Sequence, residues 1–231
     1  MKDKRDKIIH LIKTGASLFL LFTFFSLLVV ACASQGRPTG GAWDETPPVF
    51  IGSNPEPNSI RFNGNKIEIF FDEYITLEKP NETVIVTPPQ IKNPIIKGVG
   101  KKVSVELKDS LIPDVTYTFD FTNSIADNNE KNVLEGFTFA FSTGDIIDSL
   151  VVSGLLLNAK NLEPMPAMLV GLHNNLNDSA FTTIPFNRTS KTNEVGKFWI
   201  RNIASGEYNL FALEDQNRDY KYNFPAEALA D

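Results

Sequence analysis

The sequence predicts an all-β protein: two consecutive antiparallel β-sandwich domains that follow an N-terminal signal helix and a flexible tether. Apolar residues alternate with a period of two in short segments, as expected for strands with one buried face. Clusters of Asn, Asp, Gly, Pro and Ser separate these segments and indicate turns. No segment between residues 47 and 143 has a convincing apolar period of 3.6 residues. The clearest strand segments are Lys66–Phe71, Lys102–Leu107, Thr116–Phe121 and Phe137–Phe141.

Composition narrows the possible functions. The 231 residues include 14 glycines, 14 prolines and 18 phenylalanines, which favours β structure with frequent turns. From residue 32 onward the chain has 17 basic and 26 acidic residues, an acidic balance that predicts no nucleic-acid partner. Two histidines and one cysteine exclude His-based catalytic triads, paired-histidine metal sites and Cys₄ zinc sites. Paired carboxylates remain, but Asp72 and Glu73 are neighbours in a strand and should point to opposite faces.

Residues 1–31 have the layout of a secretory signal, with a basic start and an uncharged apolar run from Ala16 to Ala31. An uncleaved anchor helix is the alternative. The run ends in Val29, Val30, Ala31 and Cys32, which resembles the lipobox of bacterial lipoproteins. That resemblance implies cleavage before Cys32 and acylation of its thiol and amino group, so that a membrane is the partner. It places the protein in the cell envelope, on the outer membrane of a Gram-negative bacterium. No acidic cluster follows Cys32, which leaves the membrane face open.

Residues 32–46 are small, polar and rich in Gly and Pro, as in a flexible tether. Residues 47–145 then run from PPVFIGSNPEPNSI through IEIFFDEYI, TVIVTPP and LIPDVTYTFDFTNSIADNNEKN to FTFAFSTG. This order resembles the bacterial Ig-like domain of the SbsA type, although Lys131 replaces the usual glycine of its turn. The resemblance implies an Ig-like sandwich and an envelope setting, and it implies no activity.

Residues 150–231 form the second predicted sandwich, with strands at 150–157, 167–173, 179–183, 196–200 and 206–213. The pattern from Thr192 to Ala212, TNEVGKFWIRNIASGEYNLFA, resembles the carboxypeptidase regulatory-like, transthyretin-type β-sandwich. That module accompanies enzymes and is not catalytic. A sandwich of this type needs at least one more strand, so we expect the domain to be incomplete at its C-terminal end and the sequence to be a fragment.

Oxygen ligands at alternate positions, Asp215, Asn217 and Asp219, match what Ca²⁺ requires from a short loop. The loop lacks the glycine and the final acid of an EF-hand, because Tyr220 and Ala226 occupy those positions. The alternative is a solvated turn rich in Asx residues. No other cofactor is predicted, and His173 is expected to be a structural strand-edge residue rather than a ligand.

Two Asp-Ser-aliphatic tripeptides, at Ser149 and Ser179, resemble the acceptor used for O-glycosylation of exported proteins in some Gram-negative bacteria.

The sequence therefore predicts a non-enzymatic, lipid-anchored envelope protein whose Ig-like modules act as spacers or bind envelope proteins. A glycan-binding lipoprotein of a polysaccharide-uptake system is a second hypothesis, with Trp43, Trp199, Tyr220 and Tyr222 as candidate platforms. Since Trp199 alternates with Phe198, one of the two should face outward. A third hypothesis is the stalk of an enzyme whose catalytic part lies beyond residue 231.

Overall fold

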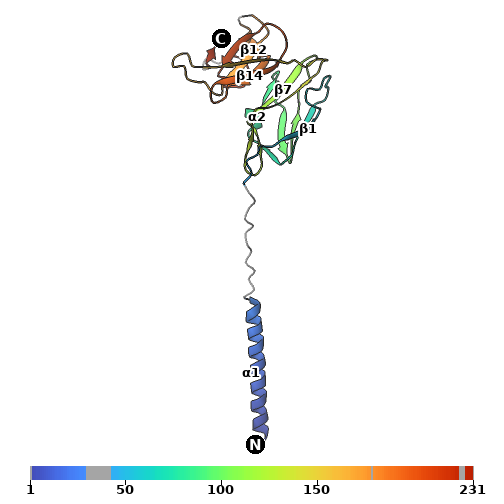
Figure 1. Ribbon diagram of the computed structural model, residues 1–231, viewed down its shortest axis with the longest axis vertical. Helices are drawn as coiled ribbons and strands as arrows, with labels where there is room; N and C mark the ends of the chain where they lie inside the picture. The colour runs from blue at the N-terminus through green and yellow to red at the C-terminus, as the bar shows by residue number, and fades with distance from the viewer. Residues whose placement is uncertain (1, 30–42, 178, 224–226, 231) are drawn as a thin grey trace. The chain divides into compact units, whose positions relative to one another are not determined.

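The computed structural model describes residues 2–29, 43–177, 179–223 and 227–230 (Figure 1). It divides into two compact units, Met1–Trp43 and Asp44–Asp231. The second unit holds every strand that the structure describes, and each described strand pair is antiparallel. The predicted all-β, antiparallel fold is therefore confirmed.

The first unit contains the helix α1 (Lys2–Val29). Its large apolar side chains between Leu11 and Phe24 are exposed, with exposed fractions of 64% or more. Within the described residues, no helix combines the length and the apolar character that crossing a membrane requires.

The strands between residues 50 and 142 form three sheets, which together we call the N-terminal sandwich. The sheet orders are β1-β2-β6-β5, β10-β7-β4 and β3-β8-β9. A short helix, α2 (Pro80–Thr83), lies between β3 and β4. The strands are β1 (Phe50–Asn54), β2 (Lys66–Phe71), β3 (Ile75–Leu77), β4 (Ile85–Thr87), β5 (Ile95–Val99), β6 (Lys102–Glu106), β7 (Thr116–Thr122), β8 (Ile125–Asp127), β9 (Val133–Leu134) and β10 (Phe137–Ser142).

Alternate residues of these strands build one apolar core. In β2, every second residue is fully buried, which is the period-two pattern read from the sequence. Aromatic rings from β7 and β10 fill the centre, where Tyr117 stacks on Phe141 with 5.2 Å between ring centroids. The Tyr117 hydroxyl accepts a hydrogen bond from the Ile112 amide at 2.8 Å, so the buried phenol is satisfied.

The remaining strands form the C-terminal sandwich, with sheet orders β11-β14 and β13-β12-β15-β16. A short helix, α3 (Ala180–Thr183), lies between β12 and β13. The strands are β11 (Leu150–Leu155), β12 (Leu169–His173), β13 (Arg188–Lys191), β14 (Lys197–Ile203), β15 (Asn209–Leu213) and β16 (Leu229–Ala230).

Strand β12 is buried on both faces. Val170 and Leu172 face the β11-β14 sheet, whereas Leu169 belongs to a second cluster on the outer face, with Phe186 and Leu213. Gly171 is required between them, because a Cβ atom at this position would lie 2.3 Å from the Phe186 ring.

The predicted strand at Ser179–Thr183 is wrong, because residues 180–183 form α3 instead. The Asn177 side chain accepts a hydrogen bond from the Ser179 amide and turns the chain just before the helix. Ala180 is then buried, and Phe181 packs on the outer cluster of the C-terminal sandwich. The apolar residues of this segment therefore cover a sheet rather than join one.

Candidate functional site

The two sandwiches meet at a junction formed by β4 and β7 on one side and by β13 and β14 on the other. The core side of β7 carries Tyr117 and Phe119. The opposite side carries Thr116 and Thr118, which are also buried, with exposed fractions of 1% and 4%. A strand that alternates threonine with aromatic residues is thus enclosed on both faces, with its polar face at the junction.

Arg188, the first residue of β13, is the central side chain of the junction. Its side chain is 8% exposed, and its Nη1 donates hydrogen bonds to the carbonyl oxygens of Thr116 at 2.5 Å and Thr87 at 3.3 Å. Its Nη2 lies 3.6 Å from Oδ2 of Asp148. One buried guanidinium therefore joins three points: β4, β7 and the connection between the sandwiches.

Asp148 lies in that connection, and both its backbone N–H and its backbone C=O are hydrogen-bonded. Its amide donates to Thr116 Oγ1 at 3.0 Å, and its carbonyl accepts from Asn202 Nδ2 at 2.9 Å. The Asn202 side chain also accepts a hydrogen bond from Thr118 Oγ1 at 3.1 Å. The connection is thereby fixed to β7 and to β14, which leaves it little freedom to act as a hinge.

Burial shifts the pKa of two charged groups at this junction. It lowers the pKa of Arg188, and the Asp148 carboxylate opposes the change. The guanidinium stays protonated, because arginine does not lose its proton in proteins. Burial also raises the pKa of Asp120 on β7, against hydrogen bonds from Thr122 and the positive charge of Arg201. The junction thus has the features of a buried structural contact in which the guanidinium of Arg188 lies close to the carboxylate of Asp148.

A cavity of about 280 Å³ lies beside Arg188. It is lined by polar residues such as Asp148 and Asn174 and by apolar residues such as Ile112 and Val115. Typical small-molecule sites have about 300–1,000 Å³ and mostly apolar walls. The cavity is therefore just below the usual size of a ligand site, and Nη1 and Nη2 of Arg188 already have partners.

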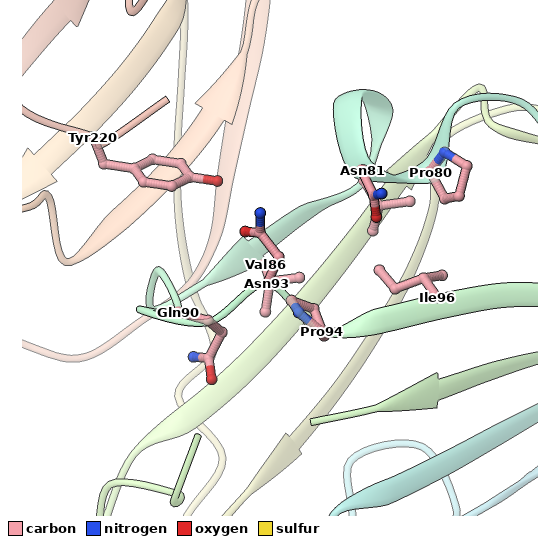
Figure 2. A pocket seen from close by; sticks show the side chains of 9 residues that line it. Pro80, Asn81, Val86, Gln90, Asn93, Pro94, Ile96 and Tyr220 are labelled. Atoms are coloured by element: carbon pink, nitrogen blue, oxygen red, sulfur yellow. The ribbon is translucent and has the colours of Figure 1, made fainter. Parts of the chain in front are cut away.

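Figure 2 shows a second pocket, in which Tyr220 from the C-terminal sandwich points toward Gln90, Val86 and Asn93 of the N-terminal sandwich. The amides and the phenol are groups that hydrogen-bond sugars. The pocket has room for about 30 Å³, which suits a water molecule and is about tenfold below the usual size of a ligand site. Tyr220 is therefore a contact between the sandwiches rather than a sugar platform in this arrangement.

The lipobox lies at the edge of the described residues. Val29 is the last residue of α1, and Val30, Ala31 and Cys32 lie outside the described residues. Acylation of Cys32 therefore stays a prediction.

In the loop proposed for Ca²⁺, the side-chain oxygens accept hydrogen bonds from backbone amides of the same loop. The Asp215 carboxylate accepts hydrogen bonds from the amides of Arg218 at 2.8 Å and Tyr220 at 3.1 Å, while Asn217 accepts from the Asp219 amide. Burial raises the pKa of Asp215 against these bonds. Within the described ranges, no three His, Cys, Asp or Glu side chains converge as a metal site. The geometry is that of successive Asx turns, and the calcium prediction stays untested.

Both predicted glycosylation serines, Ser149 and Ser179, are exposed. The aspartate before Ser149 is Asp148, whose role at the junction explains its presence without a glycan. Asp178 lies outside the described residues.

The sequence predicted structural roles for His173 and Asp72, and both side chains accept backbone hydrogen bonds. His173 ends β12 and is 1% exposed, in a central strand rather than at a sheet edge, and its Nδ1 accepts a hydrogen bond from the Asn175 amide at 3.1 Å. Asp72 Oδ1 accepts a hydrogen bond from the Val49 amide at 2.8 Å. Phe198 is 5% exposed and Trp199 is 42% exposed, so the prediction that one of this pair faces outward is confirmed.

Sequence reasoning missed Arg188. It lies in the segment FNRTSKTN, which has no apolar alternation and no charge cluster. Its partners are 101 and 72 residues away in the chain, at Thr87 and Thr116. No local signal marks such a residue, because its burial depends on a contact between two sandwiches.

Comparison with known proteins finds a family-model match for one part of the chain. Residues 44–143 match the family model of the bacterial Ig-like domain. No curated protein matches the chain. Among solved structures, the T6 backbone pilin of serotype M6 Streptococcus pyogenes, with a modular three-domain structure, is similar to it at 10% identity and a TM-score of 0.24. That similarity covers 80% of this chain and 51% of the pilin chain, so the match spans about half the length of the pilin chain.

Proposed function

We propose that the protein is a non-enzymatic, lipid-anchored spacer of the bacterial cell envelope. The match of residues 44–143 to a bacterial Ig-like domain supports a structural module. The observation that carries the proposal is the junction around Arg188, where a buried guanidinium and a fixed connection hold the two sandwiches together. A spacer must keep its length, and modules joined by a flexible linker do not.

Lipid anchoring rests on the sequence from Val29 to Cys32 and on the polar tether that follows. Two or more acyl chains give stable membrane attachment, whereas one chain gives marginal attachment. We propose that the acylated Cys32 holds the spacer on the outer membrane of a Gram-negative cell. Cells grown with radiolabelled palmitate should give a labelled protein that fractionates with membranes, and the Cys32→Ala variant should lose the label. Label that survives this substitution would contradict anchoring at Cys32.

The spacer role is tested by the distance between the sandwiches. Since Cys32 is the single cysteine of the chain, a Cys32→Ala background permits spin labels at introduced cysteines. Lys97 on β5 and Lys197 on β14 are exposed labelling positions in the two sandwiches. Double electron–electron resonance should give one narrow distance distribution, and Arg188→Met should broaden it. Lys66→Met, at an exposed position outside the junction, is the matched control. A broad distance distribution in the labelled protein that keeps Arg188 would refute a rigid spacer.

A second candidate function is glycan binding, which the exposure of Trp199 on β14 favours. An exposed indole supplies a flat apolar face of the kind that stacks on sugar rings. A glycan array should show binding that Trp199→Ala removes and that Tyr74→Ala, at an exposed aromatic residue outside the candidate platforms, leaves unchanged. An array without signal above background would remove this candidate.

A further inference from the structure

A groove of about 530 Å³ lies at one end of the N-terminal sandwich. One wall is the segment before β2, with Phe62, Asn63 and Asn65, and the other wall is the segment after β6, from Leu107 to Leu111. We call it the end groove. Sites for small molecules usually have about 300–1,000 Å³, so the end groove, unlike the two pockets described above, falls within that range.

The end groove lies far from the start of the sandwich. Strand β2 begins at Lys66, beside the groove, and ends at Phe71. The residue after it, Asp72, accepts a hydrogen bond from the amide of Val49, so the first strand is entered at the opposite end of β2. A strand of this length spans about 20 Å. The segment that leads into the sandwich therefore leaves the groove open to a long ligand.

The walls of the end groove carry polar side chains without partners. Asn63, Asn65 and Ser110 are exposed, and their side chains have no hydrogen bond within the described part of the chain. Each amide and each hydroxyl can both donate and accept a hydrogen bond. The Asp109 carboxylate is fixed by the amide of Lys92, which donates to Oδ2 at 2.9 Å, and its Oδ1 is an additional acceptor. The groove therefore offers donors and acceptors together.

Apolar side chains lie beside these polar groups. Leu107 belongs to the core of the sandwich, and the half-buried Phe62 packs edge-on against Phe141 with 4.6 Å between ring centroids. Gly64 gives the Phe62 ring its place, because a Cβ atom at residue 64 would lie 2.8 Å from Cζ of that ring. An aromatic ring is thus held in the wall of the groove, next to free amide groups.

The charges and the backbone of the end groove restrict the class of ligand. Its lysine, Lys108, is already paired with Glu106 at 2.6 Å, whereas Asp109 adds a negative charge, so phosphate and carboxylate ligands are disfavoured. Strands β2 and β6 pair with each other, and the Leu107 amide donates to the Asn65 carbonyl, so the walls present no free strand edge to an extended peptide. A neutral molecule with many hydroxyl groups and apolar C–H faces fits these conditions, and a sugar has both.

We propose that the end groove binds a neutral oligosaccharide, whose hydroxyl groups exchange hydrogen bonds with Asn63, Asn65 and Ser110 and whose C–H face packs on Phe62. This site is in the N-terminal sandwich, whereas Trp199 is on β14 of the C-terminal sandwich. It depends neither on lipid anchoring nor on the Trp199 platform, so it can fail or hold independently of both.

Calorimetric titration of the full chain in detergent with cellohexaose, xylohexaose and mannohexaose tests the site. At least one of these neutral sugars should bind, and Asn63→Ala and Asn65→Ala should each weaken its binding about 5-fold, as expected for the loss of one hydrogen bond. Asn123→Ala, at an exposed amide in the connection between β7 and β8, is the matched control and should leave the Kd unchanged. Because all three side chains are exposed, urea midpoints should show that the variants fold normally.

Three results would overturn the proposal. The first is the absence of binding by all three sugars at millimolar concentration. The second is binding that Trp199→Ala removes and Asn65→Ala leaves unchanged, because the sugar would then lie on β14. The third is binding of hexagalacturonate, which carries carboxylates, without binding of any neutral hexasaccharide, since the ligand would then be chosen by charge. Binding that Trp199→Ala leaves unchanged and Asn65→Ala weakens supports the end groove.

Discussion

Asp127, at the end of β8, is the residue whose substitution tests the N-terminal sandwich most sharply. It is 1% exposed, and its carboxylate accepts four backbone hydrogen bonds. Oδ1 accepts from the amides of Asn129, Glu130 and Lys131 at 2.7–3.0 Å, and Oδ2 accepts from the Asn132 amide at 2.7 Å. The carboxylate thus organises the whole turn between β8 and β9.

Asp127→Asn keeps the shape of the side chain but replaces one carboxylate oxygen with an NH₂ group. If the amide oxygen takes the place of Oδ1, the NH₂ group faces the Asn132 amide, so one hydrogen bond to a charged group is lost and two donors oppose each other. A hydrogen bond to a charged group contributes about 1.5–3 kcal/mol. With the weakening of the other three bonds, we expect the free energy of unfolding to fall by about 3 kcal/mol, or about 9 °C in Tm for a unit of this size.

The pH dependence gives a second readout of the same contact. Burial by itself raises the pKa of Asp127, but the four amide bonds outweigh it and hold the pKa below its ordinary value. The unfolded chain therefore binds the proton more readily than the folded chain. The stability from the ionised carboxylate is complete above the unfolded pKa of about 3.9 and is lost as the pH falls through the folded pKa.

Urea unfolding of the wild type and of Asp127→Asn, near neutral pH and at about pH 3, checks both expectations. The difference between the two proteins should be largest near neutral pH and should shrink in acid. Asp114→Asn, at an exposed aspartate with φ of 55°, is the control and should stay within about 0.5 kcal/mol of the wild type. A loss below about 1 kcal/mol near neutral pH, or a difference that grows in acid, would refute the reasoning.

Three further predictions concern the C-terminal sandwich. Gly171→Ala should lower the free energy of unfolding by about 1–3 kcal/mol, because its Cβ would collide with the Phe186 ring. Gly52→Ala, with open space around residue 52, should leave this free energy unchanged. Equal urea midpoints for Gly171→Ala and the wild type would contradict this account of the packing. Ca²⁺ binding to the loop at Asp215–Asn223, at about 100 times Kd, should add about 2.7 kcal/mol to the free energy of unfolding, and Asp219→Asn should abolish this gain. A melting curve that neither Ca²⁺ nor EDTA changes would show that the loop is a structural turn and no calcium site. Mass spectrometry of the native protein should show a glycan that is absent when both predicted acceptor serines are alanine, and an unshifted native mass would end that hypothesis.

Apolar alternation was enough to identify the strands whose two faces differ in polarity. The alternation in Lys66–Phe71 and Phe137–Phe141 became β2 and β10, because a strand with apolar residues at every second position has only one face to bury. The turn after Asp127 was equally readable as a cluster of Asn and Asp residues, since a turn depends on residues within a few positions of each other.

The tertiary structure decided what covers the second face of a strand. Thr116 and Thr118 look solvent-facing in the sequence, yet both are buried, because β13 and β14 lie against β7. For the same reason Arg188, without a local pattern, becomes the central residue of the junction, whereas the apolar residues around Phe181 cover a sheet as part of α3 instead of joining it. The alternation of apolar residues along a strand shows which face packs against the core. Only the packing of segments distant in the sequence determines whether the other face contacts water or protein.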